Sequence, residues 1–178
     1  MKLHSHAAGW VVLACLFFVA SAFAQVPIPT PMKITSSAFT EGAAIPKTFT
    51  ADGKDISPPL HIEGVPVGTK SLVLIVDDPD APRGTWNHWL VWNIDPQTKE
   101  IAENAIPGSS VQGTTDFGSA KYGGPSPPSG THRYFFRLYA LDTTLKLPAS
   151  TKRNGLDQEI AKHHILAEAK LMGKYSRK

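Results

Sequence analysis

The chain has 178 residues and a formal net charge of +3, from 18 Lys and Arg against 15 Asp and Glu. A chain of that length is long enough for one domain with a single hydrophobic core, preceded by a short N-terminal extension. Nucleic-acid binding calls for a basic stripe with interleaved aromatic residues. The basic residues here are scattered, so we expect no nucleic-acid partner. Cys15 is the only cysteine, so we expect no disulfide to stabilise the fold.

The N-terminus has the pattern of a signal peptide. Lys2 precedes an apolar run at residues 10–20, and Ala22, Phe23 and Ala24 form a small-x-small cleavage site. We therefore predict a signal peptide at residues 1–24 and a periplasmic or secreted protein. The run is shorter than the roughly 20 residues that a membrane span needs, and we expect no span in the mature chain. An uncleaved anchor, or a lipoprotein modified at Cys15, is the alternative.

The rest of the chain reads as a Pro-rich linker at residues 25–31 and one domain at residues 32–178. Alternating apolar residues predict a strand at 32–38, and a continuous apolar run predicts one at 71–76. Aromatic and β-branched residues predict two more, at 86–94 and 132–141. Both faces of 132–141 are largely apolar, so we expect that strand to be covered on both sides. These elements predict a mostly β domain.

The C-terminal third is less regular. Residues 105–129 are dense in Gly, Ser and Pro and predict a long loop. A short helix is predicted from Leu156 to His163, with Asn154 as its N-cap. Strict alternation over residues 165–176 then predicts a closing strand.

Two loop segments stand out as a candidate binding site. Residues 77–82 lead to His88, and residues 123–128 lead to His132. Each is stiffened by Pro or Gly and places a histidine at a strand start, as a pocket for a small polar ligand requires. Neither segment offers an obvious nucleophile, so we expect a binding protein rather than an enzyme.

The acidic residue Asp78 has two interpretations. Its carboxylate either hydrogen-bonds an imidazole or a ligand's ammonium group, or it caps the tight turn at Pro79. Tyr134 lies two residues after His132, hence on the same strand face, where its hydroxyl could donate to a phosphate oxygen. Arg133 points to the opposite face, and we expect it to pair with Asp80.

The glycines of the second loop have a separate interpretation. Gly123 and Gly124 allow close approach of the backbone, so their N–H groups are candidates for an anion-binding nest.

Several blocks, in order, resemble signature motifs of the phosphatidylethanolamine-binding protein family, above all its bacterial, Raf-kinase-inhibitor-like branch. They are Ser57-Pro58-Pro59-Leu60, Asp78-Pro79-Asp80-Ala81-Pro82, Trp86-Asn87-His88-Trp89, Tyr122-Gly123-Gly124-Pro125, Pro127-Pro128 and Gly130-Thr131-His132-Arg133-Tyr134. The resemblance implies a β-sandwich with a central Greek-key sheet, one or two short peripheral helices and a small anion pocket. By motif position, the ligand-binding residues are Asp78, His88, His132 and Tyr134, with Gly124, Pro125 and Pro127 at the rim.

We therefore expect an exported binding module for a small anionic or phosphorylated ligand, such as phosphate or a phosphorylethanolamine-like lipid head group, without a cofactor. The family resemblance also permits an inhibitor or regulator of a kinase or protease. Besides such a protein partner, a second copy of the chain is a candidate partner, in a homodimer. A third alternative is a metal-dependent enzyme that uses Asp78, His88 and His132 as a 2-His-1-carboxylate set. The spacing offers no His-x-Asp or HExxH motif in its support.

Overall fold

The computed structural model describes residues 30–177. The predicted signal peptide at residues 1–24 and most of the predicted linker at residues 25–31 lie outside this range. Within it, no helix is both long enough and apolar enough to cross a membrane.

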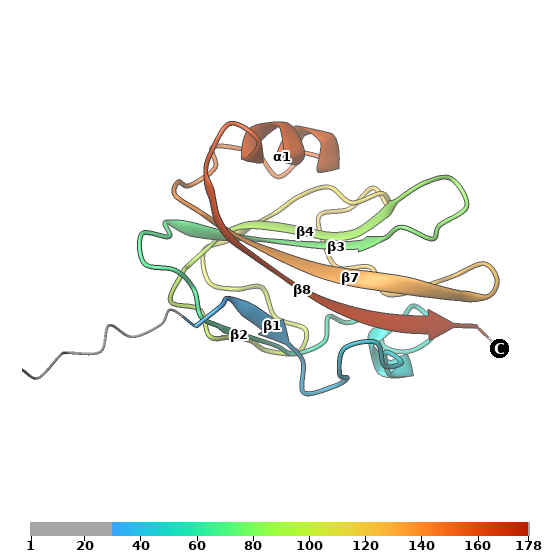
Figure 1. The fold of residues 1–178 in the computed structure, drawn as a ribbon. Helices are drawn as coiled ribbons and strands as arrows, with labels where there is room; N and C mark the ends of the chain where they lie inside the picture. The colour runs from blue at the N-terminus through green and yellow to red at the C-terminus, as the bar shows by residue number, and fades with distance from the viewer. Residues whose placement is uncertain (1–29, 178) are drawn as a thin grey trace, which may run out of the picture.

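The domain is mostly β, as predicted, and its strands form two antiparallel sheets (Figure 1). The larger sheet has the order β6-β4-β3-β7-β8 and contains β3 (Ser71–Asp78), β4 (Trp86–Ile94), β6 (Val111–Gln112), β7 (Thr131–Leu141) and β8 (Ile165–Ser176). The smaller sheet has the order β1-β2-β5 and contains β1 (Lys33–Thr35), β2 (Leu60–Glu63) and β5 (Glu100–Ile101).

The main hydrophobic core contains side chains from both sheets. Ile34 and Ile62 of the smaller sheet belong to one cluster with Leu74, Val76 and Phe136 of the larger sheet. All five are no more than 2% exposed, so burying them accounts for much of the stabilisation of the fold.

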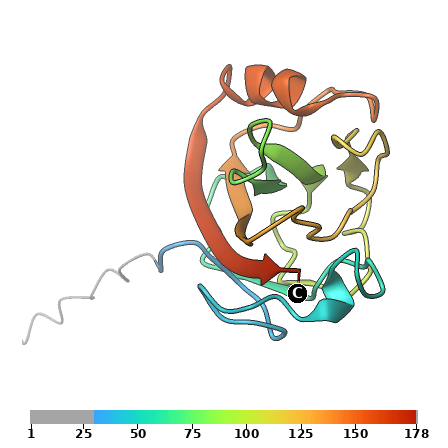
Figure 2. The same ribbon diagram turned by 90° about the vertical axis from the view of Figure 1, so that its right-hand side faces the viewer.

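A second cluster lies on the other face of the larger sheet, beneath the helix α1 (Arg153–Ile160) (Figures 1 and 2). Leu156 of the helix packs there with Val73 and Ile75 of β3. The central strand β3 is consequently buried on both faces, which explains its continuous apolar run.

The helix differs from the prediction at both ends. It begins at Arg153 and ends at Ile160, whereas we expected residues 156–163. Asn154 is not the N-cap, since it lies in the first turn; Lys152 occupies the cap position and makes no side-chain capping bond. Leu156 and Ile160 are the buried residues of the helix and form its apolar face.

The remaining differences between the prediction and the structure concern short elements. The predicted strand at residues 32–38 is limited to β1, and the predicted loop at residues 105–129 contains β6. β2 and the 3-10 helix η1 (Lys47–Phe49) were not predicted. Elements of two to four residues are too short for a hydrophobic period to show.

Candidate functional site

The site residues meet at one end of the larger sheet. β3 ends at Asp78 beside the first residue of β4, and β7 runs antiparallel to β3 on its other side. This pairing brings Asp78 and His88 close to His132 and Tyr134, although the two pairs lie more than 40 residues apart in the sequence. All four are nearly buried, with exposed fractions of 3% for Asp78, 3% for His88, 7% for His132 and 0% for Tyr134.

Asp78 makes both of the contacts considered for it. Its Oδ2 lies 2.7 Å from Nδ1 of His132, and its Oδ1 accepts a hydrogen bond of 2.9 Å from the backbone N–H of Asp80. A carboxylate can only accept, so the Nδ1 of His132 carries a proton and its Nε2 is the ring nitrogen left for other partners. The turn cap and the imidazole contact therefore coexist in one side chain.

His88 is held through its own Nδ1, which donates to the carbonyl oxygen of Gly123 at 2.7 Å. Burial lowers the pKa of His88; the hydrogen bond to Gly123 and the nearby carboxylates, chiefly Asp78, oppose that effect. The ring is thus neutral near pH 7, and its Nε2 is a hydrogen-bond acceptor.

Tyr134 carries the unsatisfied polar group of the site. Its ring packs edge-on against His88, with ring centroids 5.2 Å apart. Its buried hydroxyl has no hydrogen-bond partner among residues 30–177. Asp78 and the backbone of Ser126 lie nearby without reaching bonding geometry, and burial followed by the Asp78 charge raises the pKa of Tyr134. The hydroxyl therefore stays protonated and is a buried donor without an acceptor among the described residues.

The expected nest of glycine amides is not formed. The N–H of Gly124 donates to Oδ1 of Asp55 at 2.6 Å, and the N–H of Gly123 donates to the backbone oxygen of His88 at 2.9 Å. Both donors are used inside the protein, so Gly124 shapes the site through its backbone path rather than through a free amide. A Cβ on Gly124 would lie 2.7 Å from backbone atoms of Thr50, which explains the glycine.

The rest of the rim segment is packed into the protein. Pro125 and Pro127 are buried, and the Pro125 carbonyl accepts the N–H of Ala51 at 3.1 Å. The segment is thereby anchored to the turn that follows η1.

The predicted ion pair between Arg133 and Asp80 is confirmed. The guanidinium makes two hydrogen bonds to the carboxylate, from Nε at 2.9 Å and from Nη2 at 2.6 Å. The Arg133 backbone N–H adds a third, at 2.9 Å. These bonds lower the pKa of Asp80 to about 2 and tie the loop after β3 to the start of β7.

No group of three His, Cys, Asp or Glu side chains in residues 30–177 lies close enough together to hold a metal ion. Of the proposed ligand set, both histidines already use Nδ1 for protein contacts, and Asp78 accepts two hydrogen bonds.

Two residues of this region were not found from the sequence. Asp55, which binds Gly124, has a positive φ of 57° and lies 69 residues away from it in the sequence. Phe117 packs against His88 with ring centroids 5.2 Å apart, from within the predicted loop at residues 105–129. No local pattern marks either contact, because each depends on the tertiary path of a loop.

The fold and this polar cluster can be compared with known proteins. The family model for phosphatidylethanolamine-binding protein matches residues 35–176, so the chain belongs to this family. A UPF0098 protein of Methanothermobacter thermautotrophicus is 50% identical over 152 residues, which cover 82% of this chain and 99% of that protein.

Two crystal structures are also similar to this protein. A putative phosphatidylethanolamine-binding protein homologue from Chlamydia trachomatis is 42% identical, with a TM-score of 0.79, covering 83% of this chain and 99% of its own. YbcL of E. coli, described as a new member of the mammalian family, is 30% identical, with a TM-score of 0.78, covering 84% of this chain and 100% of its own.

Proposed function

We propose that this protein binds a small anionic or phosphorylated ligand, such as phosphate or a phosphorylethanolamine-like head group, among Asp78, His88, His132 and Tyr134. The observation that carries the proposal is the Tyr134 hydroxyl, which is buried without a partner beside the His132–Asp78 pair. A buried hydroxyl that makes no hydrogen bond costs about 1–3 kcal/mol. A ligand oxygen that accepts from it would remove that cost.

The charges of the cluster suit a ligand that both accepts and donates. The Asp78 carboxylate holds the His132 ring through Nδ1–H, which leaves Nε2 of His132 and the Tyr134 hydroxyl for the ligand, and the hydroxyl donates to a phosphate oxygen. The neutral His88 offers an acceptor, which calls for a proton on the ligand. A singly protonated phosphate or a zwitterion with an ammonium group meets both requirements.

Family membership supports the same proposal. The matching family is named for binding phosphatidylethanolamine, whose head group is a zwitterionic phosphate ester. Both structural relatives are described as belonging to that family or as a putative homologue of it.

Calorimetric titration with inorganic phosphate and with phosphorylethanolamine tests the proposal. Losing a hydrogen bond to a charged ligand costs about 1.5–3 kcal/mol, so His132→Ala should weaken binding by roughly ten- to a hundredfold. His163→Ala is the control, because that side chain contacts Glu159 near the end of α1. Equal effects of both substitutions would locate the ligand elsewhere.

A further inference from the structure

The four side chains of the candidate site include a carboxylate but neither a lysine nor an arginine. Asp78 carries the negative charge, and it lies beside His132. A phosphate bound next to a carboxylate is repelled by it, so a positive charge is needed close by. A guanidinium suits this purpose best, because its planar fork matches the geometry of a phosphate.

The C-terminal end of β8 brings an arginine to the same face of the sheet. Tyr175 of β8 pairs in register with His132 of β7, and residues paired in this way lie on one face. Arg177 is two residues beyond Tyr175, so it continues that face. Figures 1 and 2 show that this end of β8 lies at the same end of the molecule as η1.

The charge of Arg177 acts on the Tyr134 hydroxyl. Burial and the Asp78 charge raise the pKa of Tyr134, and the Arg177 charge opposes them. The two side chains are therefore neighbours, although no hydrogen bond joins them. Arg133 does not compete for this role, because it points to the opposite face and gives both Nε and Nη2 to Asp80.

The guanidinium of Arg177 is paired with Asp52 on the turn after η1. Its Nε lies 3.0 Å from both carboxylate oxygens, and its Nη2 lies 2.8 Å from Oδ1. The Arg177 and Asp52 side chains are 41% and 27% exposed, and ion pairs that are open to solvent contribute little to stability. A ligand can therefore replace the carboxylate at low cost.

Asp52 would keep other partners after such an exchange. It also accepts a hydrogen bond of 3.0 Å from the Tyr175 hydroxyl. Lys47 lines the same cavity of about 630 Å³ as Asp52 and Arg177. Two cations thus face one carboxylate in this cavity, so its charge stays positive with Asp52 included.

We propose that Arg177 binds the phosphate group of the ligand by exchanging the Asp52 carboxylate for phosphate oxygens. The inference rests on the proposed function, since the same phosphate would accept a hydrogen bond from Tyr134. Asp52 and the ligand then compete for one guanidinium. Removing Arg177 should weaken binding, whereas removing the Asp52 charge should strengthen it.

Calorimetric titration with inorganic phosphate tests this exchange. Arg177→Gln should weaken binding about tenfold, and Arg177→Lys, which keeps the charge but loses the fork, about threefold. Asp52→Asn should tighten binding about threefold. Lys174→Gln is the matched control, because Lys174 is an exposed cation on the opposite face of β8; its affinity should stay within about twofold.

The opposite signs separate ligand binding from a structural role. Asp52→Asn and Arg177→Gln break the same ion pair, so a pair that only holds the C-terminus in place would shift the affinity in one direction. The gain from Asp52→Asn should also disappear when Arg177→Gln is added, because no guanidinium is then left to release.

Each contrary outcome has a definite meaning. Weaker binding in both single variants, unchanged binding in Arg177→Gln, or an equal loss in Lys174→Gln would overturn the role of Arg177. If His132→Ala still weakens binding in those cases, the proposed phosphate site stands without Arg177. Failure of the unmodified protein to bind phosphate would overturn both proposals.

Discussion

Two consecutive carboxylates at the end of β3 form two different kinds of polar cluster. Asp77 and Asp78 are 2% and 3% exposed, and they point to opposite faces of the sheet because side chains alternate along a strand. Asp78 faces His132 and the Tyr134 hydroxyl. Asp77 faces two arginines, which carry their charge at every ordinary pH.

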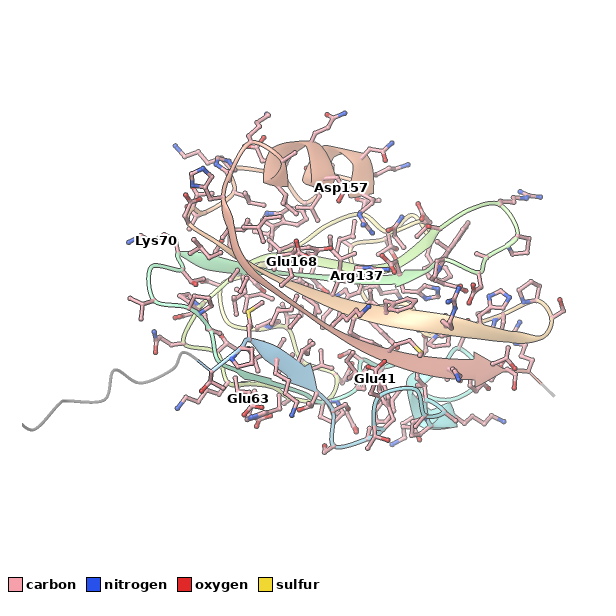
Figure 3. The ribbon with its side chains drawn as sticks, in the orientation of Figure 1. Glu41, Glu63, Lys70, Arg137, Asp157 and Glu168 are labelled. Atoms are coloured by element: carbon pink, nitrogen blue, oxygen red, sulfur yellow. The ribbon has the colours of Figure 1, made fainter. Side chains whose placement is uncertain are left out.

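The Asp77 cluster is fully connected. Asp77 accepts from Nε of Arg137 at 2.9 Å and from Nη1 of Arg153 at 3.1 Å. Arg153 also donates to Asn87 on β4 at 3.0 Å and to Asp157 on its own helix at 2.8 Å. In Figure 3, Arg137 lies on the face of β7 below α1, and Asp157 lies on the helix above it. The cluster therefore joins β3, β4, β7 and α1.

Under the proposed function, one strand end serves stability on one face of the sheet and ligand binding on the other. The charges around Asp77 are permanent and their hydrogen bonds link separate elements, which suits a structural role. The cluster around Asp78 contains two histidines, whose charge can change, and a hydroxyl without a partner. Only this second cluster is left incomplete by the protein.

The largest effect is expected where the structural cluster is broken. Asp77→Asn removes the buried negative charge that both arginines share. It should lower the free energy of unfolding by about 2–3 kcal/mol. This loss is slightly smaller than the one expected for a fully buried ion pair, because the two arginines are partly exposed. Urea denaturation measures the change. Phosphate affinity should be unaltered under conditions where the variant is folded.

Asp157→Asn is the matched control for that substitution. Its carboxylate also pairs with Arg153, but its side chain is 50% exposed, so the loss of stability should be clearly smaller. Equal losses in the two variants would show that burial of Asp77 does not set the strength of the cluster.

Tyr134→Phe should produce the opposite pattern. Removing a hydroxyl that has no partner should leave the free energy of unfolding unchanged or raise it, while phosphate affinity falls by about tenfold or more. Tyr122→Phe is a useful comparison, since the Tyr122 hydroxyl donates to the Phe49 carbonyl oxygen at 2.8 Å. That variant should lose about 1 kcal/mol of stability and retain phosphate binding. Destabilisation of Tyr134→Phe without a loss of affinity would contradict a ligand-binding role for this hydroxyl.

A smaller effect is expected from pH. Burial holds the pKa of His88 below the value of about 6.5 that it has in the unfolded chain. Between the two values the unfolded state binds more protons, so stability should fall as the pH decreases from 7 through this window. His88→Asn keeps a donor for the Gly123 carbonyl oxygen and should flatten this dependence. Melting temperatures between pH 5 and pH 8 measure it, and an unchanged slope in the variant would exclude His88 as its source.

The sequence predicted the long strands, in which many successive residues follow one pattern of burial. The apolar run of β3, the aromatic and β-branched residues of β7 and the alternation in β8 identified three long strands of the larger sheet. The helix start was misplaced because Asn154 is a good local cap, whereas tertiary contacts of Arg153 with Asp77 and Asn87 fix that residue at the start of the helix.

The candidate site was predictable only where contacts follow from strand geometry. His132 and Tyr134 share a face because they are two residues apart, and the Asp80–Arg133 pair follows from their places on adjacent segments. The use of the Gly124 amide by Asp55 could not be anticipated, since nothing local indicates that the turn after η1 reaches this loop. The contact of Phe117 with His88 depends on the same kind of loop path.

The pairing of β3 with β7 has a consequence for how the residues of the proposed site come together during folding. β3 and β4 are consecutive strands joined by the loop at residues 79–85, so they can form a hairpin early, which would place Asp78 near His88. His132 and Tyr134 join them only when β7 pairs with β3, a non-local step of the kind that makes β-rich proteins fold in milliseconds to seconds. A ligand that needs all four side chains therefore cannot guide the early hairpin; it can only stabilise the chain after this slow closure.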